Sequence, residues 1–252
     1  MSQENLSLLK ALDVLDLFSK DNVEYRLSEI ANLLNMPVST THRILRTLEK
    51  RDYIRQNPSN GKYLLGVSAF VLGSNVVGIN VMVDAALPRI AELASKYQAT
   101  SHVATLRNGR LLCVGRVESP FVKIDTPARG EQHELQVTSL GKCLLAFSSP
   151  QVLEGLLKSI TYRAITPNSI TDEEELLEEL QRVRKQGYAL DRSESSKGLF
   201  CFGSPIFAKD GSLLAAISVA LHASSMPDNA ASIITDVKQA ADEISKHVAL
   251  TS

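Results

Sequence analysis

The sequence predicts an α+β protein with a small, mainly helical N-terminal part and a larger C-terminal part built on a mainly antiparallel sheet. Residues 27–65 carry two short helical patterns followed by two short β-prone runs. After residue 100, β-prone runs flank the turn signals Asn108-Gly109 and Lys209-Asp210-Gly211, so hairpins dominate and helices are expected to pack on them. A length of 252 residues suits one large domain or two moderate ones.

The composition is that of a globular protein, with 44% hydrophobic and 22% charged residues. The sequence has no long apolar run that predicts a membrane span, and its first residues lack the basic and apolar regions of a signal peptide. We therefore expect a cytoplasmic protein without a membrane partner. Its three cysteines are widely spaced and form no CxxC pair, which favours reduced thiols.

The first predicted helix covers residues 7–20, and we expect it to complete the core of the N-terminal part. Its apolar residues are assigned to one packed side: Leu8, Leu9, Leu12, Leu15, Leu17 and Phe18.

Two short helices joined by a tight turn follow. Ser28 is a candidate N-cap of the first, and Asn35 and Pro37 end it. Ser39 is expected to cap the second helix. Its inward face holds Thr41, Ile44, Leu45 and Leu48, and its outward face holds Thr40, His42, Arg43, Arg46, Thr47 and Lys50. This pattern predicts a helix-turn-helix.

A β-hairpin around Asn60-Gly61 comes next, and a helix-turn-helix followed by a hairpin is a winged helix. Residues 39–62 hold six Lys or Arg against two Asp or Glu, a net +4, whereas the whole chain is −1 and the remainder therefore −5. Such a basic island suits binding to the phosphates of double-stranded DNA. The alternative is a small helical subdomain with an ordinary charged surface. The predicted DNA-binding residues are Ser39, Thr40, His42, Arg43, Arg46, Thr47, Lys50, Arg55 and Lys62, the last two on the wing.

The remaining elements follow from periodicity and turn signals. A connecting helix is expected over 66–78, and its apolar side chains could pack within the chain or against a second copy. Further helices are expected over 81–97, 138–147, 172–185 (capped by Thr171) and 233–248, and strands over 101–107, 111–117, 121–125, 188–191, 199–207 and 213–221.

The chain resembles the IclR-type bacterial transcriptional regulators. Besides the winged helix, three blocks carry the resemblance: Arg129-Gly130 with Leu135 and residues 138–146; residues 187–191 with Glu194, Gly198, Cys201 and Pro205; and residues 215–219. The resemblance implies a DNA-binding domain over 1–66, a linker helix over 67–80 that favours dimerisation, and a GAF-like or profilin-like effector-binding and oligomerisation domain over 81–252. It also implies a homodimer or a dimer of dimers.

The sequence departs from the family pattern near the implied pocket. Glu134 and Gln136 flank Leu135 where the family more often has Pro and His, and Ala220 stands where a second Ser is frequent. The usual pocket chemistry is therefore expected to be altered, and the pocket to be somewhat less polar.

An enzyme is a weaker hypothesis. Cys201 could act as a nucleophile with His102, His133 or His222 as its base, but a cysteine in an apolar strand is usually an inert core residue. No Cys or His pair has metal-ligand spacing, and neither GxGxxG nor a P-loop is present. We therefore expect no metal and no cofactor.

A small-molecule pocket is better supported, because Ser139, Asp191, Glu194 and Ser218 are polar groups within apolar segments. The start of the helix at Ser139 would suit a carboxylate. Each residue also has a simple structural interpretation as a helix cap, a strand end or a cross-strand contact. The resemblance adds Cys201 to Asp191 and Ser218 as pocket residues and implies a small organic-acid effector. The predicted effector site comprises Ser139, Leu140, Asp191, Glu194, Cys201, Ser218 and Ala220.

The sequence thus predicts a ligand-responsive DNA-binding regulator. Two alternatives remain open: a hydrolase-like or transferase-like enzyme with an N-terminal DNA-docking module, and an architectural DNA-binding protein without a ligand.

Overall fold

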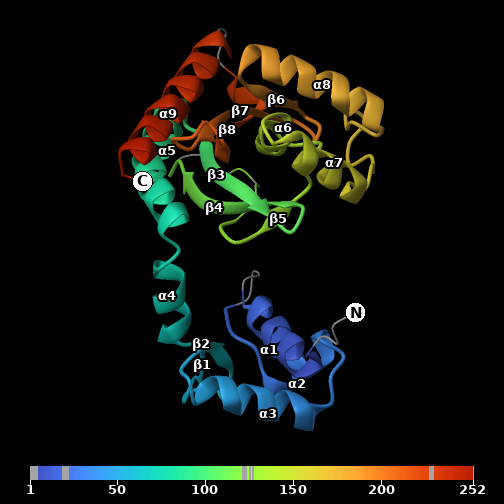
Figure 1. Cartoon of the computed structure of the whole chain (residues 1–252), viewed down its shortest axis with the longest axis vertical. Coiled ribbons are helices and arrows are strands. Elements are labelled where there is room, and N and C mark those ends of the chain that lie inside the picture. The colour runs from blue at the N-terminus through green and yellow to red at the C-terminus, as the bar shows by residue number, and fades with distance from the viewer. Residues whose placement is uncertain are drawn as a thin grey trace. The chain divides into compact units, whose positions relative to one another are not determined.

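The computed structural model describes residues 5–18, 23–120, 124, 126, 128–226 and 230–251 (Figure 1). The chain divides into two compact units, residues 1–80 and 81–252. The elements of the first unit are α1 (Leu6–Leu17), α2 (Leu27–Leu33), α3 (Val38–Glu49), β1 (Ile54–Gln56), β2 (Tyr63–Leu65) and α4 (Val67–Ser74).

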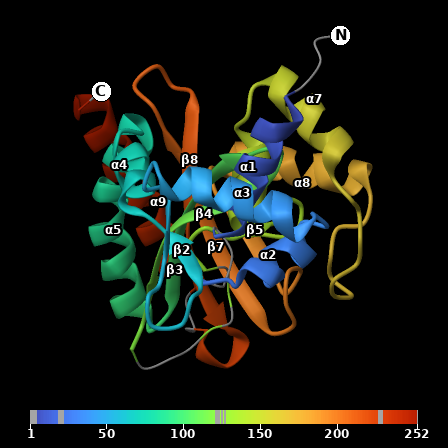
Figure 2. The same ribbon diagram turned by 90° about the horizontal axis from the view of Figure 1, so that it is seen from below.

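The first unit is a helix-turn-helix with a hairpin wing. Its core gathers side chains from α1, α2, α3 and both wing strands: Val14, Leu17, Phe18, Tyr25, Ile30, Leu45, Ile54 and Tyr63. Asn35 adopts a positive φ of 49° directly after α2, as the turn between the two helices requires. Figure 2 shows α3 at the outer surface of this unit, with α1 and α2 behind it on either side.

The predicted capping residues are wrong for both central helices. Helix α2 begins at Leu27, one residue before Ser28, and the Glu29 carboxylate accepts the Arg26 N–H at 2.6 Å. Helix α3 begins at Val38 directly after Pro37, so Ser39 lies inside its first turn. In both cases the helix starts before the serine, whose side chain cannot then cap it.

The leucines assigned to the packed side of α1 also need correction. Leu8, Leu9 and Leu12 are exposed, whereas Val14, Leu17 and Phe18 are buried. Only the C-terminal half of α1 packs into the core of its own unit. The N-terminal half presents apolar side chains to solvent.

The wing is an antiparallel hairpin in which Ile54 pairs with Leu65 and Gln56 with Tyr63. Its turn is longer than Asn60-Gly61 alone, since six residues separate the paired strands. The Glu24 carboxylate accepts hydrogen bonds from the side-chain amides of Asn57 and Asn60, both at 2.8 Å. These bonds fix the turn to the segment that precedes α2.

The connecting helix expected over 66–78 is interrupted. Helix α4 ends at Ser74, and two residues separate it from α5 (Val77–Tyr97). The Asn80 side-chain amide donates to the carbonyls of Gly73 and Ser74 at 3.0 and 2.9 Å. It satisfies two carbonyls that a continuous helix would have bonded internally.

The second unit is a six-stranded sheet with helices on both faces. Its elements after α5 are β3 (Thr100–Arg107), β4 (Arg110–Glu118), β5 (Gln132–His133), α6 (Ser139–Ala146), α7 (Pro150–Ser159), α8 (Glu173–Gln186), β6 (Ala189–Arg192), β7 (Leu199–Phe207), β8 (Leu213–His222), the 3-10 turn Ala223–Ser225 and α9 (Ala230–Thr251). The strand order is β5-β4-β3-β8-β7-β6, and every described pair is antiparallel. This confirms the predicted α+β class.

The turn signals are confirmed as well. Asn108 and Gly109 both have positive φ, 50° and 75°, and join β3 to β4 as a two-residue turn with Arg107 opposite Arg110. Gly211, with φ of 80°, lies in the turn between β7 and β8.

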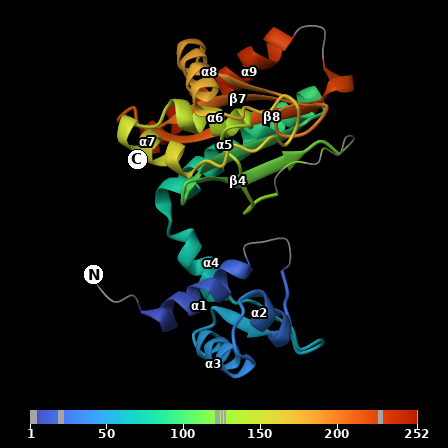
Figure 3. The same ribbon diagram turned by 90° about the vertical axis from the view of Figure 1, so that its right-hand side faces the viewer.

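Helices α6 and α9 contact the same two strands, β7 and β8, and therefore cover opposite faces of the sheet (Figure 1). Helix α8 packs on the outer side of α6 (Figure 3). Figure 1 shows α5 alongside α9. The buried face of α5 is the predicted one: Met82, Ala86, Ile90, Leu93 and Ala94.

Two further features differ from prediction, and one predicted strand falls on residues that the structure does not describe. Asp172, not Thr171, caps α8, because its carboxylate accepts the Glu175 N–H at 2.8 Å. Helix α7 was not expected, although Ser149 as N-cap followed by Pro150 is a start signal. The strand expected over 121–125 lies outside the described residues except for Ile124.

Candidate functional site

The outer face of α3 carries the predicted DNA-contacting side chains. Thr41 and Leu45 are buried against the core, which leaves the opposite side of the helix to solvent. Thr40 is half-buried there, and the others are exposed: Ser39, His42, Arg43, Arg46, Thr47 and Lys50. Within the described part of the chain, Arg43 and Arg46 form no ion pair, so both guanidinium groups are available to a ligand.

The wing adds two cations. Arg55 is exposed on β1, and Lys62 is half-buried at the end of the turn. Hydrogen bonds from Asn57 and Asn60, and the charge of Lys62, lower the pKa of Glu24, which therefore stays ionised. This carboxylate holds the turn, and hence Lys62, in place.

A groove of about 490 Å³ runs between α1 and the outer side of α3. Lys10 of α1 lines it together with Thr40, Arg43 and Thr47. Sequence reasoning did not single out Lys10, because only the crossing of α1 and α3 brings it beside the recognition face.

The second candidate site lies on the sheet face that α6 covers. Antiparallel pairing aligns Asp191 with Cys201, Cys201 with Ala220, and Ala220 with Thr100. Directly paired residues point to the same face with their Cβ atoms about 5 Å apart. Three residues predicted from separate segments thus form one row across β6, β7 and β8.

The next row on the same face contains Gly203, Ser218 and His102, which are paired across β7, β8 and β3. A Cβ atom at Gly203 would lie 3.0 Å from the backbone C and O of Ser139, so the first turn of α6 rests directly on this row. Gly203 has no side chain, and this permits the close approach. The structure therefore brings Ser139 of α6 and Ser218 of β8 to the same part of the sheet.

Two residues that sequence reasoning did not assign to the pocket continue this row onto the far strands. His102 is opposite Arg116 of β4, and its Nε2 lies 3.0 Å from the Thr126 hydroxyl. Burial, with smaller contributions from the charges of Arg116 and His133, lowers the pKa of His102 to about 3. His102 is therefore a neutral hydrogen-bonding group, and Arg116 carries the positive charge of this row.

Asp191 organises the loop beside the row. Its carboxylate accepts the Glu194 N–H at 2.7 Å and the Ser195 N–H at 3.4 Å, and also accepts from the Ser195 hydroxyl. Burial raises the pKa of Asp191 although these bonds oppose the rise.

Glu194 faces a buried cation. Its carboxylate lies 2.7 Å from Nζ of Lys142, a side chain of α6 that is 1% exposed. The same Nζ donates to the Leu190 carbonyl at 2.6 Å. Glu194 thus acts on the site through Lys142, which holds the loop 191–195 against α6.

The described cysteines are buried thiols rather than nucleophiles. Burial raises the pKa of Cys113 to about 11 and that of Cys143 to about 12. The pKa of Cys201 is raised as well, first by burial and then by the neighbouring Asp191. A thiol that stays protonated at neutral pH has little reactivity, which removes the structural basis for the Cys201 nucleophile hypothesis.

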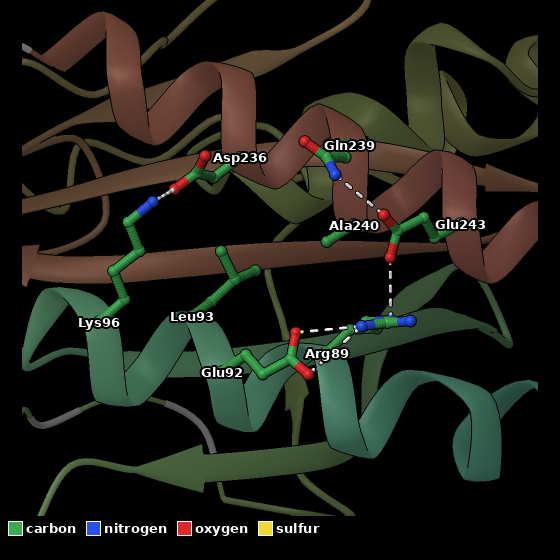
Figure 4. A pocket seen from close by; sticks show the side chains of 8 residues that line it. All are labelled: Arg89, Glu92, Leu93, Lys96, Asp236, Gln239, Ala240 and Glu243. Carbon is green, nitrogen blue, oxygen red and sulfur yellow. Dashed lines mark hydrogen bonds and ion pairs between the residues drawn. The ribbon is translucent and has the colours of Figure 1, made fainter.

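A separate cavity of about 310 Å³ lies between α5 and α9 (Figure 4). Its charged side chains are engaged with one another: Arg89 pairs with Glu92 at 3.1 Å and with Glu243 at 3.0 Å, and Lys96 pairs with Asp236. These bonds fasten α5 to α9.

Among the described residues, no single helix is long and apolar enough to cross a membrane. Helices α4 and α5 meet that requirement only when counted together as a bent pair.

Two family descriptions match this chain, one in each of its two parts. The family description "Bacterial transcriptional regulator IclR C-terminal" matches residues 75–246, and "IclR helix-turn-helix domain" matches residues 7–58. The chain is 32% identical over 222 residues to the HTH-type transcriptional regulator XynR of Escherichia coli, covering 88% of each chain. It is 32% identical over 241 residues to BhcR of Paracoccus denitrificans, covering 95% of this chain and 86% of the relative.

Solved structures share the fold over the whole length. An IclR transcriptional regulator from Alicyclobacillus acidocaldarius is 28% identical, with a TM-score of 0.83 over 98% of this chain and 100% of the other. An IclR homologue from Microbacterium hydrocarbonoxydans, solved with 4-hydroxybenzoate, has a TM-score of 0.87 at 21% identity over 98% and 100%. A DNA-binding helix-turn-helix joined to this C-terminal domain, with named regulators as relatives, identifies the chain as a transcriptional regulator rather than an enzyme: it belongs to the IclR family.

Proposed function

We propose that this regulator binds operator DNA as a homo-oligomer in the cytoplasm and controls a catabolic operon in response to a small organic acid. The observation that carries the proposal is the set of polar groups that β6, β7, β8 and α6 bring together on one sheet face, in a chain whose α3 exposes Arg43 and Arg46 to solvent.

DNA binding follows from the outer face of α3. In a winged helix this helix enters the major groove, where arginine side chains can read the O6 and N7 atoms of guanine. We assign base reading to Arg43 or Arg46, flanked by Ser39, Thr40, His42, Thr47 and Lys50. Arg55 and Lys62 of the wing are assigned to phosphate.

Oligomerisation is supported by apolar surface on the N-terminal unit. No residue of α4 is buried, and Val67, Phe70 and Leu72 are 61%, 74% and 62% exposed. The exposed leucines of α1 add to this surface. Patches of this kind indicate a protein partner, and we assign a second copy, either as a dimer or within a dimer of dimers. A dimer can read two half-sites spaced about 34 Å apart.

The effector site is assigned to the two rows on the sheet. The carboxylate of the effector binds at the start of α6, where the first N–H groups of a helix favour an anion, with Ser139, Leu140 and Ser218 around it. Asp191 repels a carboxylate and therefore borders the effector on the β6 side of the site, where it can accept from a hydroxyl. Cys201 and Ala220 form the floor of the site, and Glu194 supports the loop through Lys142.

The related structure solved with 4-hydroxybenzoate supports an acid with a hydroxyl group, since that molecule has both. We therefore expect a hydroxy acid to bind this chain more tightly than a plain alkanoate.

The function is tested by combining a search for the operator with a search for the effector. DNA fragments retained by the protein are sequenced, and organic acids are screened for a rise in the melting temperature. Ser218→Ala and Asp191→Ala should each lower the affinity for the acid so identified roughly tenfold or more, because truncating a buried hydrogen-bonding partner costs ~1–3 kcal/mol. Calorimetry measures this affinity. Wild-type affinity in both variants would show that these side chains only support the fold.

A further inference from the structure

The sheet face that holds the effector site contains a buried hydroxyl group without a partner. Thr100 is 0% exposed, and its Oγ1 has no hydrogen-bond partner among the described residues. Thr100 pairs with Ala220 on β8, so its side chain points to the same face as Ala220 and Cys201. A buried hydroxyl left unsatisfied costs free energy, so this group calls for a partner such as a water molecule, an ion or a ligand.

A second unpartnered donor lies close by on the neighbouring strand. The Arg116 Nε atom is buried and has no acceptor among the described residues, although its guanidinium donates to the Ile124 carbonyl at 3.2 Å and pairs with Glu118. Arg116 is opposite His102, two residues along from Thr100 on the same face. Cross-strand diagonal neighbours have Cβ atoms about 7 Å apart, a spacing that one oxygen-bearing group between them can bridge.

We propose that the effector site extends across β8 onto β3 and β4, where Thr100 and Arg116 bind an oxygen acceptor at the end of the effector remote from its α6-bound carboxylate. This inference rests on the proposed effector site and adds two residues, Thr100 and Arg116, that select the oxygen function of the acid on the β3 and β4 side.

The geometry sets the minimum length of this acid. Ser139 rests over β7, and Thr100 lies on β3, two strands away. Two strand spacings amount to about 10 Å between backbones, from which the side chains subtract several ångströms. The two oxygen functions therefore belong at opposite ends of a short chain or a ring, either as a hydroxyl and a carboxylate or as two carboxylates.

Three matched sets of acids test the proposal on the full-length protein. Each set keeps the carbon frame and changes only the far end: butyrate, 4-hydroxybutyrate and succinate; hexanoate, 6-hydroxyhexanoate and adipate; benzoate and 4-hydroxybenzoate. Affinities are measured by calorimetry. In the set whose frame fits, the far-end oxygen should raise the affinity of the wild-type protein at least tenfold, and comparison of the hydroxyl and carboxylate members shows which oxygen function the site takes.

The variants remove one donor at a time. Thr100→Val replaces the hydroxyl by a methyl group of similar size, and Arg116→Lys keeps the positive charge but lacks the Nε–H. Both variants should lose most of the tenfold gain in affinity that the far-end oxygen gives. Their affinity for the plain acid should stay within about twofold of the wild-type value. Thr100→Ser should retain the gain. The matched control is Ser101→Ala, because Ser101 is also buried and its hydroxyl also has no partner among the described residues, but it points to the opposite face.

Stability measurements separate binding from a structural role. If Thr100 is a ligand group, the melting temperature of Thr100→Val without ligand should equal or exceed that of wild type, because no bond is lost. A clear fall would assign Thr100 a structural role and overturn the proposal. The proposal would also be overturned if the far-end oxygen still raised the affinity of both variants, or if the acids within every set bound with equal affinity. Either result would leave the acid-effector function intact. Failure of every acid to bind would overturn the acid-effector function itself.

Discussion

Burial determines the charge state of individual residues at the effector site. His102 lies between Ser218 and Arg116 in one row of the sheet face, and its imidazole is 2% exposed. Its pKa of about 3 keeps it uncharged throughout the physiological range. The row therefore holds a neutral imidazole next to Arg116, whose guanidinium pairs with Glu118.

The lowered pKa of His102 predicts a pH dependence of stability. Between the unfolded pKa of 6.5 and the folded pKa of about 3, the unfolded chain binds a proton that the folded protein does not. The free energy of unfolding should therefore fall as the pH is lowered below 6.5, by up to ~1.4 kcal/mol per pH unit from this residue. Urea unfolding of His102→Gln between pH 7.5 and 5 should show a correspondingly flatter slope. Parallel slopes in variant and wild type would contradict the assignment.

The recognition residues make a different residue-scale prediction. Arg43→Ala or Arg46→Ala should cost ~1–3 kcal/mol in operator binding and relax the base preference at one position. Arg55→Ala and Lys62→Ala should instead weaken binding to all DNA sequences alike, because Arg55 and Lys62 are assigned to phosphate. They should also make the DNA affinity less dependent on the salt concentration. Fluorescence anisotropy at several salt concentrations measures both effects. Unchanged operator affinity in both Arg43→Ala and Arg46→Ala would show that α3 is not the recognition helix.

At the scale of elements, one buried lysine joins three parts of the second unit. Lys142 of α6 contacts Glu179 of α8 at 3.4 Å, the Leu190 carbonyl of β6 at 2.6 Å and the Glu194 carboxylate at 2.7 Å. Burial raises the pKa of Glu194, and the charge and hydrogen bond of Lys142, together with the Arg192 N–H, oppose this rise. The position of α6 over the sheet therefore depends on Lys142.

Removal of Lys142 should be strongly destabilising. Lys142→Met leaves Glu194 buried without its cation, for which we expect a loss of ~3–5 kcal/mol in the free energy of unfolding. Lys158→Met is the matched control, because Lys158 pairs with Glu154 on α7 while both side chains are more than two-thirds exposed. An exposed pair of this kind contributes ~0–1 kcal/mol. Equal effects of the two substitutions in urea unfolding would contradict the structural role of Lys142.

At the scale of the whole molecule, the chain has two units with separate cores. The first core is built from α1, α2, α3 and the wing, and a core of the second from the sheet with α6, α7 and α8. An apolar core of its own allows a unit to fold alone.

Separate expression of the units tests this division. Residues 81–252 should fold by circular dichroism and bind the effector acid with the affinity of the full chain. Residues 1–80 should bind operator DNA weakly, since they lack residues 81–252, to which the sequence assigns oligomerisation together with effector binding. An unfolded C-terminal fragment would show that the second unit depends on the first.

Local chemistry was sufficient to predict most elements of this protein. Helical periodicity in α3 and α5 specifies which side is buried, because the same side chains recur at each turn. Asn108-Gly109 specifies a two-residue hairpin, because both positions require positive φ. The outward residues of α3 were predictable for the same reason, since a buried stripe of Thr41 and Leu45 leaves only one side free.

Tertiary structure alone decided the capping residues, the exposed side of α1 and the composition of the effector site. Ser28, Ser39 and Thr171 are good capping residues, but the direction from which the chain enters each helix places the first turn elsewhere. The leucines of α1 form an apolar stripe in any environment, and only the docking of α1 on α3 shows which of them the unit covers. Thr100, His102 and Arg116 join Ser218 and Cys201 only through the pairing of β3 with β4 and β8. The pairing of β3 with β8 connects segments more than a hundred residues apart, and no pattern within either segment encodes it.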